Sequence, residues 1–530
     1  MKVLSASLAV MLLLVVAPAT AQESIFVSGS FEATPNGAVE ASNRIDELVA
    51  QQWTELDLKP AALSSDAVFV RRAYLVTIGT LPTEEEVRDF LSSEDEVKRQ
   101  FLIERLLERP EFADYWAMKW GDLLRVKAEF PIKLWPNAVQ AYHHWILDSI
   151  RNNKPYHQFA RELLVGSGSN FREGEVNFYR AMQDRTPQGI ASTVALTLMG
   201  ERTEHWPERK LDAMAGFFSH VAYKATSEWK EEIVYFDPTM DEARLFEGAI
   251  CPDGTAVTLD PTQHDPRAIF ADWLIRPENP AFTKAIANRT WAWLMGRGIV
   301  EEADDMGAHN PPSNPPLLDF LAQEFADSQC DLQHLFRIIL NSRTFKLSSI
   351  PVQQTPEAVS QFTHYPLRRM EAEVLIDALN AITATKEDYS SPIPEPFTFI
   401  PDDIRAIALA DGSITSSFLE LYGRPPRDTG LESERSRNTT AAQRLHLLNS
   451  SHVQKKIKVC PLVIWGNGTC LEERPEMVER IYLTVLSRYP TEDELLVVQE
   501  HFDSPDLSSG AIASDLVWAL FNQPEFFFIH

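Results

Sequence analysis

The chain has few cysteines and few basic residues for its length. Its 530 residues include four Cys, and 49 Lys and Arg stand against 76 Asp and Glu. The formal net charge of −27 excludes general binding to nucleic acid or to an anionic membrane surface, because like charges repel. No Cys-x-x-Cys-His run occurs, so covalent haem attachment has no candidate. Hydrophobic residues make up 44% of the chain, enough for an ordinary globular core.

The chain also lacks an apolar run long enough to span a bilayer. Its longest apolar stretch, Leu4 to Val16, follows Lys2 and precedes Ala19-Thr-Ala21, a small-x-small site. This arrangement is typical of a cleaved secretory signal. We therefore expect residues 1–21 to be a signal peptide, residues 22–44 to be a loose leader, and the mature chain to be periplasmic or secreted, without membrane insertion.

Export would permit disulfide bonds among Cys251, Cys330, Cys460 and Cys470. Cys460 and Cys470 flank a short segment in which Gly466-Asn-Gly468 can reverse the chain. The sequence thus predicts a local Cys460–Cys470 disulfide. For Cys251 and Cys330 two states stay open, a second disulfide or buried thiols.

Helical periodicity dominates from Ile45 onward, and the same helical unit recurs at both ends. Thr83 followed by Glu86 is a capping box that starts one helix. The repeated segments are Arg72 to Glu86 with Arg480 to Glu494, and Pro110-Glu-Phe112 with Pro524-Glu-Phe526, and a weaker third copy is Leu335 to Phe345. We expect a mainly α fold of helical bundles with long Pro-rich connections and a pseudo-repeated helical unit at both ends. A duplicated packing unit is favoured over a duplicated binding module.

Two connections stand out in the second half of the chain. Asp253-Gly254 and Asp260-Pro261 place a linker at 237–264. The segment 392–401 contains four prolines, which excludes a helix there and favours an extended path over a helical surface.

Several ordered motifs resemble a known pair of domains. The motifs are Asp66-Ala-Val-Phe-Val-Arg-Arg-Ala-Tyr-Leu75, Lys154-Pro-Tyr-His-Gln-Phe-Ala-Arg-Glu-Leu-Leu164, Asn288-Arg-Thr-Trp291, Asn310-Pro-Pro-Ser-Asn-Pro315 and Gln443-Arg-Leu-His-Leu-Leu-Asn-Ser450. The first two resemble the planctomycete cytochrome-associated domain (domain of unknown function 1549), and the others resemble its usual companion (domain of unknown function 1553). On this resemblance we expect the first domain at 45–236, the second at 265–470, and a C-terminal repeat of the N-terminal unit at 471–530.

The resemblance implies an exported bacterial protein, often encoded beside a sulfatase-like protein, with no established activity. Members of the family commonly carry a Cys-x-x-Cys-His-x-His-Pro run where this chain has Leu198 to Pro207. The thiols that would attach haem or hold a soft metal are absent, and His205 alone does not replace them. We therefore expect no cofactor.

Other metal-ligand patterns are incomplete. His143-His144 point about 100° apart on a helix, and Cys330 with His334 offers two ligands where a structural zinc site needs four. Asp304-Asp305 with Asn310 could bind a hard cation such as Ca²⁺, although such acids more often cap helices or pair with Arg. The sequence assigns no metal site.

The most unusual segment is rich in arginine. Between Arg405 and Arg444 the chain has six Arg in 40 residues, and Arg424-Pro-Pro-Arg427 holds two of them on a stiff loop. Guanidinium groups and hydroxyls suit carboxylate, sulfate or phosphate. The candidate ligand-binding residues are Asp411, Ser413, Arg424, Arg427, Asp428 and Arg435. The alternative is an Arg–Asp/Glu network that pins two helices across an irregular loop.

Three functions follow from these patterns. The first is an exported, non-catalytic interaction or scaffold protein that docks an anionic ligand or a sulfatase-like partner, with an anionic glycan as a candidate ligand. The second is a hydrolase for sulfated or acidic polysaccharide, with Asp411, Ser413 and Arg424 in its site. The third is an electron-transfer component that has lost its haem. The sequence does not assign an enzymatic activity.

Overall fold

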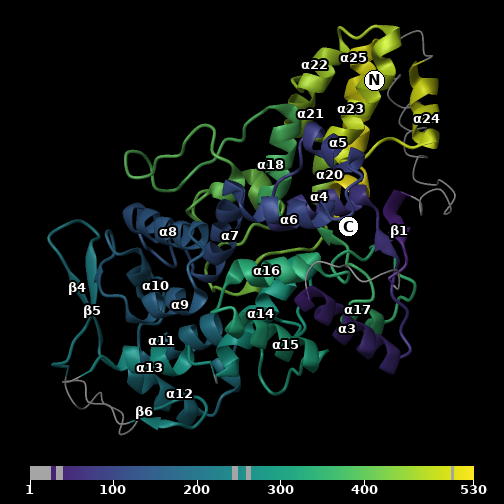
Figure 1. Ribbon diagram of the computed structural model, residues 1–530. Coiled ribbons are helices and arrows are strands. Elements are labelled where there is room, and N and C mark those ends of the chain that lie inside the picture. Colours follow the sequence, from purple (N-terminus) through teal and green to yellow (C-terminus); the bar gives the residue numbers. More distant parts are fainter. Residues whose placement is uncertain (1–24, 32–39, 241–248, 258–263, 278, 503–506) are drawn as a thin grey trace.

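The computed structural model describes residues 25–31, 40–240, 249–257, 264–277, 279–502 and 507–530. The predicted signal peptide (1–21) lies outside these residues, as do parts of the leader (22–44) and of the linker (237–264). The described chain is mainly helical, which confirms the predicted fold class (Figure 1). Within the described part, no helix has the length and apolarity needed to cross a membrane.

The first half of the chain contributes ten helices to the described structure. They are α3 (Glu40–Glu55), α4 (Asp66–Thr77), α5 (Glu84–Ser92), α6 (Lys98–Leu107), α7 (Pro110–Leu123), α8 (Pro136–Arg151), α9 (Tyr156–Val165), α10 (Asn177–Arg180), α11 (Pro187–Val194) and α12 (Glu208–Ala215). Proline at the first turn of α7, α8 and α11 fixes where these helices begin, because its missing N–H has no partner there in any case.

The second half continues in the same manner. Its helices are α13 (Pro266–Leu274), α14 (Pro280–Met295), α15 (Pro315–Asp327), α16 (Leu332–Asn341), α17 (Pro356–Ser360), α18 (Ala372–Thr383), α19 (Ser417–Leu421), α20 (Ala441–Asn449), α21 (Ser451–Lys458), α22 (Pro461–Gly466), α23 (Arg474–Leu486), α24 (Glu492–Phe502), α25 (Ser509–Phe521) and α26 (Pro524–Phe527). The segment 392–401 contains no helix, as its prolines predict.

The strands are short and antiparallel. They are β1 (Val27–Gly29), β2 (Leu63–Ser64), β3 (Gly168–Ser169), β4 (Val221–Ala225), β5 (Glu232–Phe236), β6 (Ala249–Ile250), β7 (Ala256–Val257), β8 (Arg368–Arg369) and β9 (Phe528–Ile529). Only one sheet has three strands, in the order β3-β5-β4, and its β4–β5 hairpin projects from the helical body among the described elements (Figure 1).

An aromatic core joins the two halves of the chain. Trp116 and Trp120 on α7 lie 5.3 and 5.9 Å, between ring centroids, from Trp293 on α14. Phe336 on α16 packs edge-on against Trp116 at 4.4 Å. All four side chains are buried. Buried aromatic pairs of this kind contribute about 0.5–1.5 kcal/mol each beyond their area, so the two halves share one core.

The two copies of the helical unit pack against each other. Arg88 on α5 pairs with Glu479 on α23, and Arg480 on α23 pairs with Glu84 on α5 at 3.0 Å. Figure 1 accordingly shows N-terminal α5 beside C-terminal α23. The repeat therefore serves as an interlocking packing unit, which is the interpretation that the sequence favours.

The matching residues of the two copies make matching contacts. Thr83 and Glu86 form the predicted capping box, and Thr491 and Glu494 exchange the same two hydrogen bonds. In each copy the capping glutamate and the glutamate of the Pro-Glu-Phe motif bind one arginine. Arg109 pairs with Glu86 and Glu111, and Arg488 pairs with Glu494 and Glu525.

The predicted Cys460–Cys470 disulfide is wrong. Both residues are free thiols, as are Cys251 and Cys330, which are buried. The segment between Cys460 and Cys470 forms helix α22 instead of a hairpin, and a helix separates its ends by about 1.5 Å per residue. Cys460 is buried, with Sγ 3.4 Å from the carbonyl of Ile382, whereas Cys470 is exposed.

Candidate functional site

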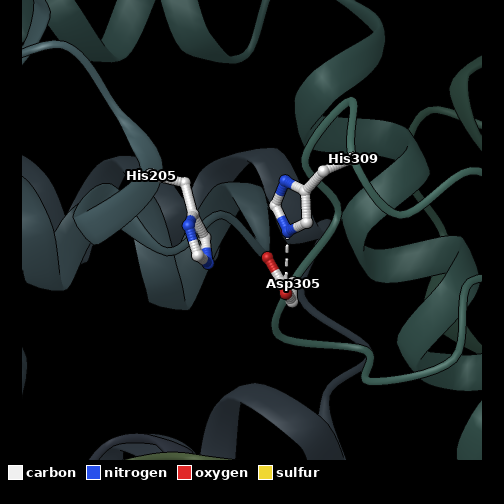
Figure 2. Close-up of side chains that lie close together, drawn as sticks. All are labelled: His205, Asp305 and His309. Atoms are coloured by element: carbon white, nitrogen blue, oxygen red, sulfur yellow. Dashed lines mark hydrogen bonds and ion pairs between the residues drawn. The ribbon is translucent and has the colours of Figure 1, made fainter.

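Three side chains of the types that commonly bind metals meet on the surface between two loops. His205, Asp305 and His309 each offer one ligand atom, and these atoms all lie within 4.8 Å of one another. Nε2 of His309 is 3.0 Å from Oδ2 of Asp305, and the two imidazole centroids are 4.4 Å apart. Figure 2 shows both imidazoles next to the same carboxylate.

The first loop is positioned by a helix end. Helix α11 continues into one wider turn, Ala195–Met199, which ends at Gly200 with φ +64°. The carbonyl of Gly200 accepts a hydrogen bond from Met306 N at 2.8 Å, so the first loop touches the second directly. A Cβ at position 200 would lie 3.0 Å from the carbonyl oxygen of Ala303, and this close approach together with the positive φ requires glycine. His205 closes a short turn, Thr203–His205, five residues further on.

The second loop is held from within. Nδ2 of Asn310 donates to the carbonyls of Glu301 and Asp305, at 2.6 and 2.9 Å. Asp304 is buried, pairs with Arg289 at 2.8 Å and accepts a hydrogen bond from Glu432 N. The calcium interpretation of Asp304, Asp305 and Asn310 is therefore wrong, because Asp304 and Asn310 anchor the loop and only Asp305 faces the histidines.

The carboxylate of Asp305 has an oxygen that is available for a further interaction. Its Oδ1 is buried and has no hydrogen-bond partner among the described residues. A buried carboxylate oxygen without a donor is costly, because it has lost its water and gained nothing in return. A cation held jointly with the two imidazoles would remove that cost.

A cavity of about 480 Å³ opens beside His205. Its lining residues are Arg125, Ser192, Thr193, Leu196, Arg202, Thr203, Glu204, His205, Thr429 and Leu431. Two arginines and four hydroxyl-bearing side chains are among these residues, although most of the exposed lining surface is apolar. Thr429 and Leu431 belong to the arginine-rich segment that the sequence singles out, although its arginines do not line the cavity.

The candidate arginines Arg424, Arg427 and Arg435 do come together, but beneath the surface. Asp122 on α7 accepts from Arg427 at 2.9 Å and from Arg435 at 2.7 Å, and Glu373 on α18 pairs with Arg435 at 2.6 Å and with Arg424 at 3.3 Å. Their side chains are at most 4% exposed, so no ligand reaches them. The expected open patch of cations is absent at these residues, and the geometry is the pinning network that the sequence offers as the alternative.

The other candidate residues hold backbone. Oδ1 of Asp411 accepts from Ala128 N at 2.9 Å and from Ser413 N at 2.8 Å, and Oγ of Ser413 accepts from Glu129 N at 2.9 Å. Asp428 pairs with Lys127 at 2.6 Å. These contacts fix the 126–129 segment against the 411–428 segment. They give Ser413 no base, so the nucleophile suggested for the hydrolase lacks its partner.

Sequence reasoning missed the cluster of His205, Asp305 and His309 because two loops supply it. His205 belongs to one segment, and Asp305 with His309 to another about 100 residues away. The Asp305-x-x-x-His309 spacing was a local signal for a ligand pair, since residues four apart can share a face. Nothing in the sequence places His205 beside that pair.

Two family models match the chain. Residues 44–216 match a protein of unknown function, DUF1549 (PSCyt2), and residues 266–502 match a protein of unknown function, DUF1553 (PSD1). The chain is a DUF1549–DUF1553 protein. No curated protein and no solved structure matches it. In this DUF1549–DUF1553 protein, His205 lies in the first matched segment, and Asp305 and His309 lie in the second, so the triad bridges the two.

Proposed function

We propose that this DUF1549–DUF1553 protein is an exported metal-binding protein whose centre is His205, Asp305 and His309. The observation that carries the proposal is the convergence of two imidazoles and one carboxylate within 4.8 Å. Metal–ligand bonds of about 2.1 Å place tetrahedral ligand atoms ~3.4 Å apart, and the His309–Asp305 pair is already at 3.0 Å. A small rotation of the exposed His205 completes the set.

The donor set indicates the class of metal. Imidazole nitrogen suits Zn²⁺, Fe²⁺, Co²⁺ or Cu²⁺, whereas Ca²⁺ and Mg²⁺ prefer oxygen ligands throughout. Three protein ligands leave at least one coordination position free, as in catalytic zinc sites and unlike structural ones. A metal held there would supply Lewis-acid chemistry toward an anion or water. The chain's own part is to hold three ligands in place and to offer a cavity beside His205 that two arginines line.

This centre also changes the candidate functions. Docking of an anionic ligand and hydrolysis of an acidic substrate both remain proposals, and both move from Asp411, Ser413 and Arg424 to the metal centre. The cavity beside His205 favours them over a scaffold role, because a scaffold needs no cavity next to a metal ligand. Electron transfer through haem finds no support here, because the chain has no Cys-x-x-Cys-His run that could attach a haem covalently.

The test is metal binding by the full mature chain. After dialysis against a chelator, Zn²⁺ and Co²⁺ should each bind at one ion per chain, measured by calorimetry and by elemental analysis. Co²⁺ should also give the visible absorption of a cation with nitrogen ligands. His205→Ala, Asp305→Asn and His309→Ala should each weaken binding more than about tenfold, since each removes one ligand of three.

His144→Ala is the matched control, because His144 is an exposed histidine outside the triad. It should bind Zn²⁺ as tightly as the unaltered chain. Equal affinity in the control and in a His205→Ala/His309→Ala double variant would refute the proposed centre.

Export is tested separately. Lys2, the apolar stretch that follows it and Ala19-Thr-Ala21 support cleavage after residue 21. N-terminal sequencing of protein recovered from the periplasm or medium should therefore begin at Gln22. A chain that is recovered from the cytoplasm with Met1 intact would contradict this.

A further inference from the structure

Arg125 is a buried cation with no counter-charge. It follows the end of α7, has φ +57° and is 7% exposed. Within the described chain, no acceptor hydrogen-bonds to its guanidinium and no carboxylate lies within 4.0 Å of it. Its side chain lines the 480 Å³ cavity beside His205.

This situation differs from that of the other buried arginines nearby. Arg427 and Arg435 each pair with Asp122, and Arg289 pairs with Asp304. A largely buried guanidinium without a partner is unfavourable, because it loses most of its hydration and gains no attraction in exchange. Burial accordingly lowers the pKa of Arg125, with Tyr142 and Glu434 opposing the shift only from a distance.

Glu434, an acid whose charge acts on Arg125, does not serve as its hydrogen-bonded partner. The carboxylate of Glu434 accepts hydrogen bonds from the backbone N–H of Asp428 and of Thr429, at 3.1 and 2.9 Å. Its role is to close the 428–434 turn. Glu204 also lines the cavity, but it is exposed and lies outside ion-pair distance of Arg125.

A second arginine on the cavity wall is also under-used. Nε of Arg202 is buried and has no acceptor among the described residues. Its one ion pair, Nη2 to Glu302, is long at 3.6 Å. Arg125 and Arg202 thus both line the cavity with guanidinium groups that are incompletely paired, together with the side chains of Ser192, Thr193 and Thr429.

The backbone makes room for Arg125. Gly430 has φ +73°, and a Cβ there would lie 2.9 Å from Nε of Arg125 and 2.7 Å from the carbonyl of Leu123. Any other residue would push the guanidinium out of its position. The fold therefore keeps an unpaired cation on a cavity wall, at a position that only glycine leaves open.

We propose that this cavity binds the oxyanion group of a ligand, a carboxylate, sulfate or phosphate, between Arg125 and Arg202. Guanidinium groups donate paired hydrogen bonds to such groups, and a cavity of this size encloses a small ligand or the end of a chain. His205 lies on the same wall, so the bound anion sits beside the proposed metal. The site goes beyond that centre, because Arg125 needs an anion whether or not a metal is bound.

The experiment uses the full mature chain, stripped of metal, at constant ionic strength set with chloride. Inorganic sulfate, inorganic phosphate and galacturonate are titrated in separate arms, followed by calorimetry and by thermal unfolding, so that the arms distinguish the three oxyanions. At least one should bind saturably and raise the unfolding temperature. A response in all arms no larger than that to added chloride would overturn the proposal.

Arg125→Met provides the decisive variant. It should weaken anion binding at least tenfold, and it should not lower the unfolding temperature of the anion-free protein, because it removes an uncompensated buried charge. Arg125→Lys should bind with intermediate affinity, since it keeps the charge and loses the paired donors. Arg444→Met, at an exposed arginine, controls for net charge and should bind as the unaltered chain does.

Two outcomes distinguish an anion site from a purely structural arginine and from the metal centre. If Arg125→Met lowers the unfolding temperature and leaves anion affinity unchanged, Arg125 is a structural residue and the proposal is wrong. His205→Ala/His309→Ala should keep its anion affinity in the metal-free state. The metal centre and the anion site can therefore fail independently.

Discussion

Asp122 accepts hydrogen bonds from both Arg427 and Arg435 in the buried ionic network. Asp122→Asn therefore tests whether that network stabilises the fold. Burial alone would raise the pKa of Asp122, but the charges of Arg435 and Arg427 outweigh it and keep the pKa below its ordinary range. The variant leaves Arg427 with carbonyl partners only, whereas Arg435 retains Glu373. Breaking a buried pair in this way costs about 3–5 kcal/mol, because a buried charge loses its partner.

The loss is measurable by calorimetry or urea unfolding. An unfolding entropy of about 2.1 cal/mol/K per residue gives ~1.1 kcal/mol per kelvin for 530 residues. Asp122→Asn should therefore lower the unfolding temperature by about 3–5 °C. The control is Asp148→Asn, which breaks an exposed pair with Arg151 at 3.4 Å and should change stability by less than about 1 kcal/mol.

A double variant sharpens the result. Asp122→Asn with Arg427→Met removes both charges, so its loss should be smaller than the sum of the two single losses by about 1–3 kcal/mol. If Asp122→Asn unfolds at the same temperature as Asp148→Asn, the network does not stabilise the fold and the reasoning fails.

Three further predictions follow from single residues. Burial, and then the charge of Arg427, lower the pKa of His143 to about 3. In the unfolded chain this histidine takes up a proton below about pH 6.5, so the free energy of unfolding should fall between pH 6.5 and pH 3 by up to ~1.4 kcal/mol per pH unit. His143→Gln should reduce this pH dependence in urea titrations. Exposed Cys470 should react at once with a thiol reagent in the folded chain, while buried Cys460 should react only after unfolding. A reductant should not change the unfolding temperature, and a change would instead support the Cys460–Cys470 disulfide. Gly430→Ala should lose about 1–3 kcal/mol because alanine is strained at φ +73°, measured by urea unfolding, and an unchanged midpoint would refute the crowding described around Arg125.

The sequence predicts the local features of this fold well. Thr83 with Glu86 gives a capping box, Pro110 starts α7, and the prolines of 392–401 exclude a helix, since each effect acts within a few residues. The same holds for the repeat, whose paired segments carry the same capping and aromatic residues. Both domains are also recognisable from short ordered motifs.

Sequence reasoning fails for side chains whose interaction partners lie far away in the sequence. The arginines at 424, 427 and 435 look free in the sequence because their acids lie elsewhere, Asp122 about 300 residues upstream and Glu373 about 50–60 upstream. Arg125 appears unremarkable in the sequence, because only the folded structure shows that no described acid forms an ion pair with it. The disulfide fails for the opposite reason, since a helix keeps apart two residues that are close in sequence.

The contacts of α4 determine when the protein can finish folding. Arg71 donates to the carbonyl of Val485, 414 residues later, and Arg72 donates to the carbonyl of His530, 458 residues later. At a synthesis rate of about 5–20 residues per second, Arg71 waits roughly 20–80 s for its acceptor. Until then two arginines destined for the interior must stay in water, and their helix cannot take its final place. The first helical unit is thus completed only after the unit at 474–530 has been made, and a chain that lacks residues 474–530 would leave Arg71 and Arg72 without these acceptors.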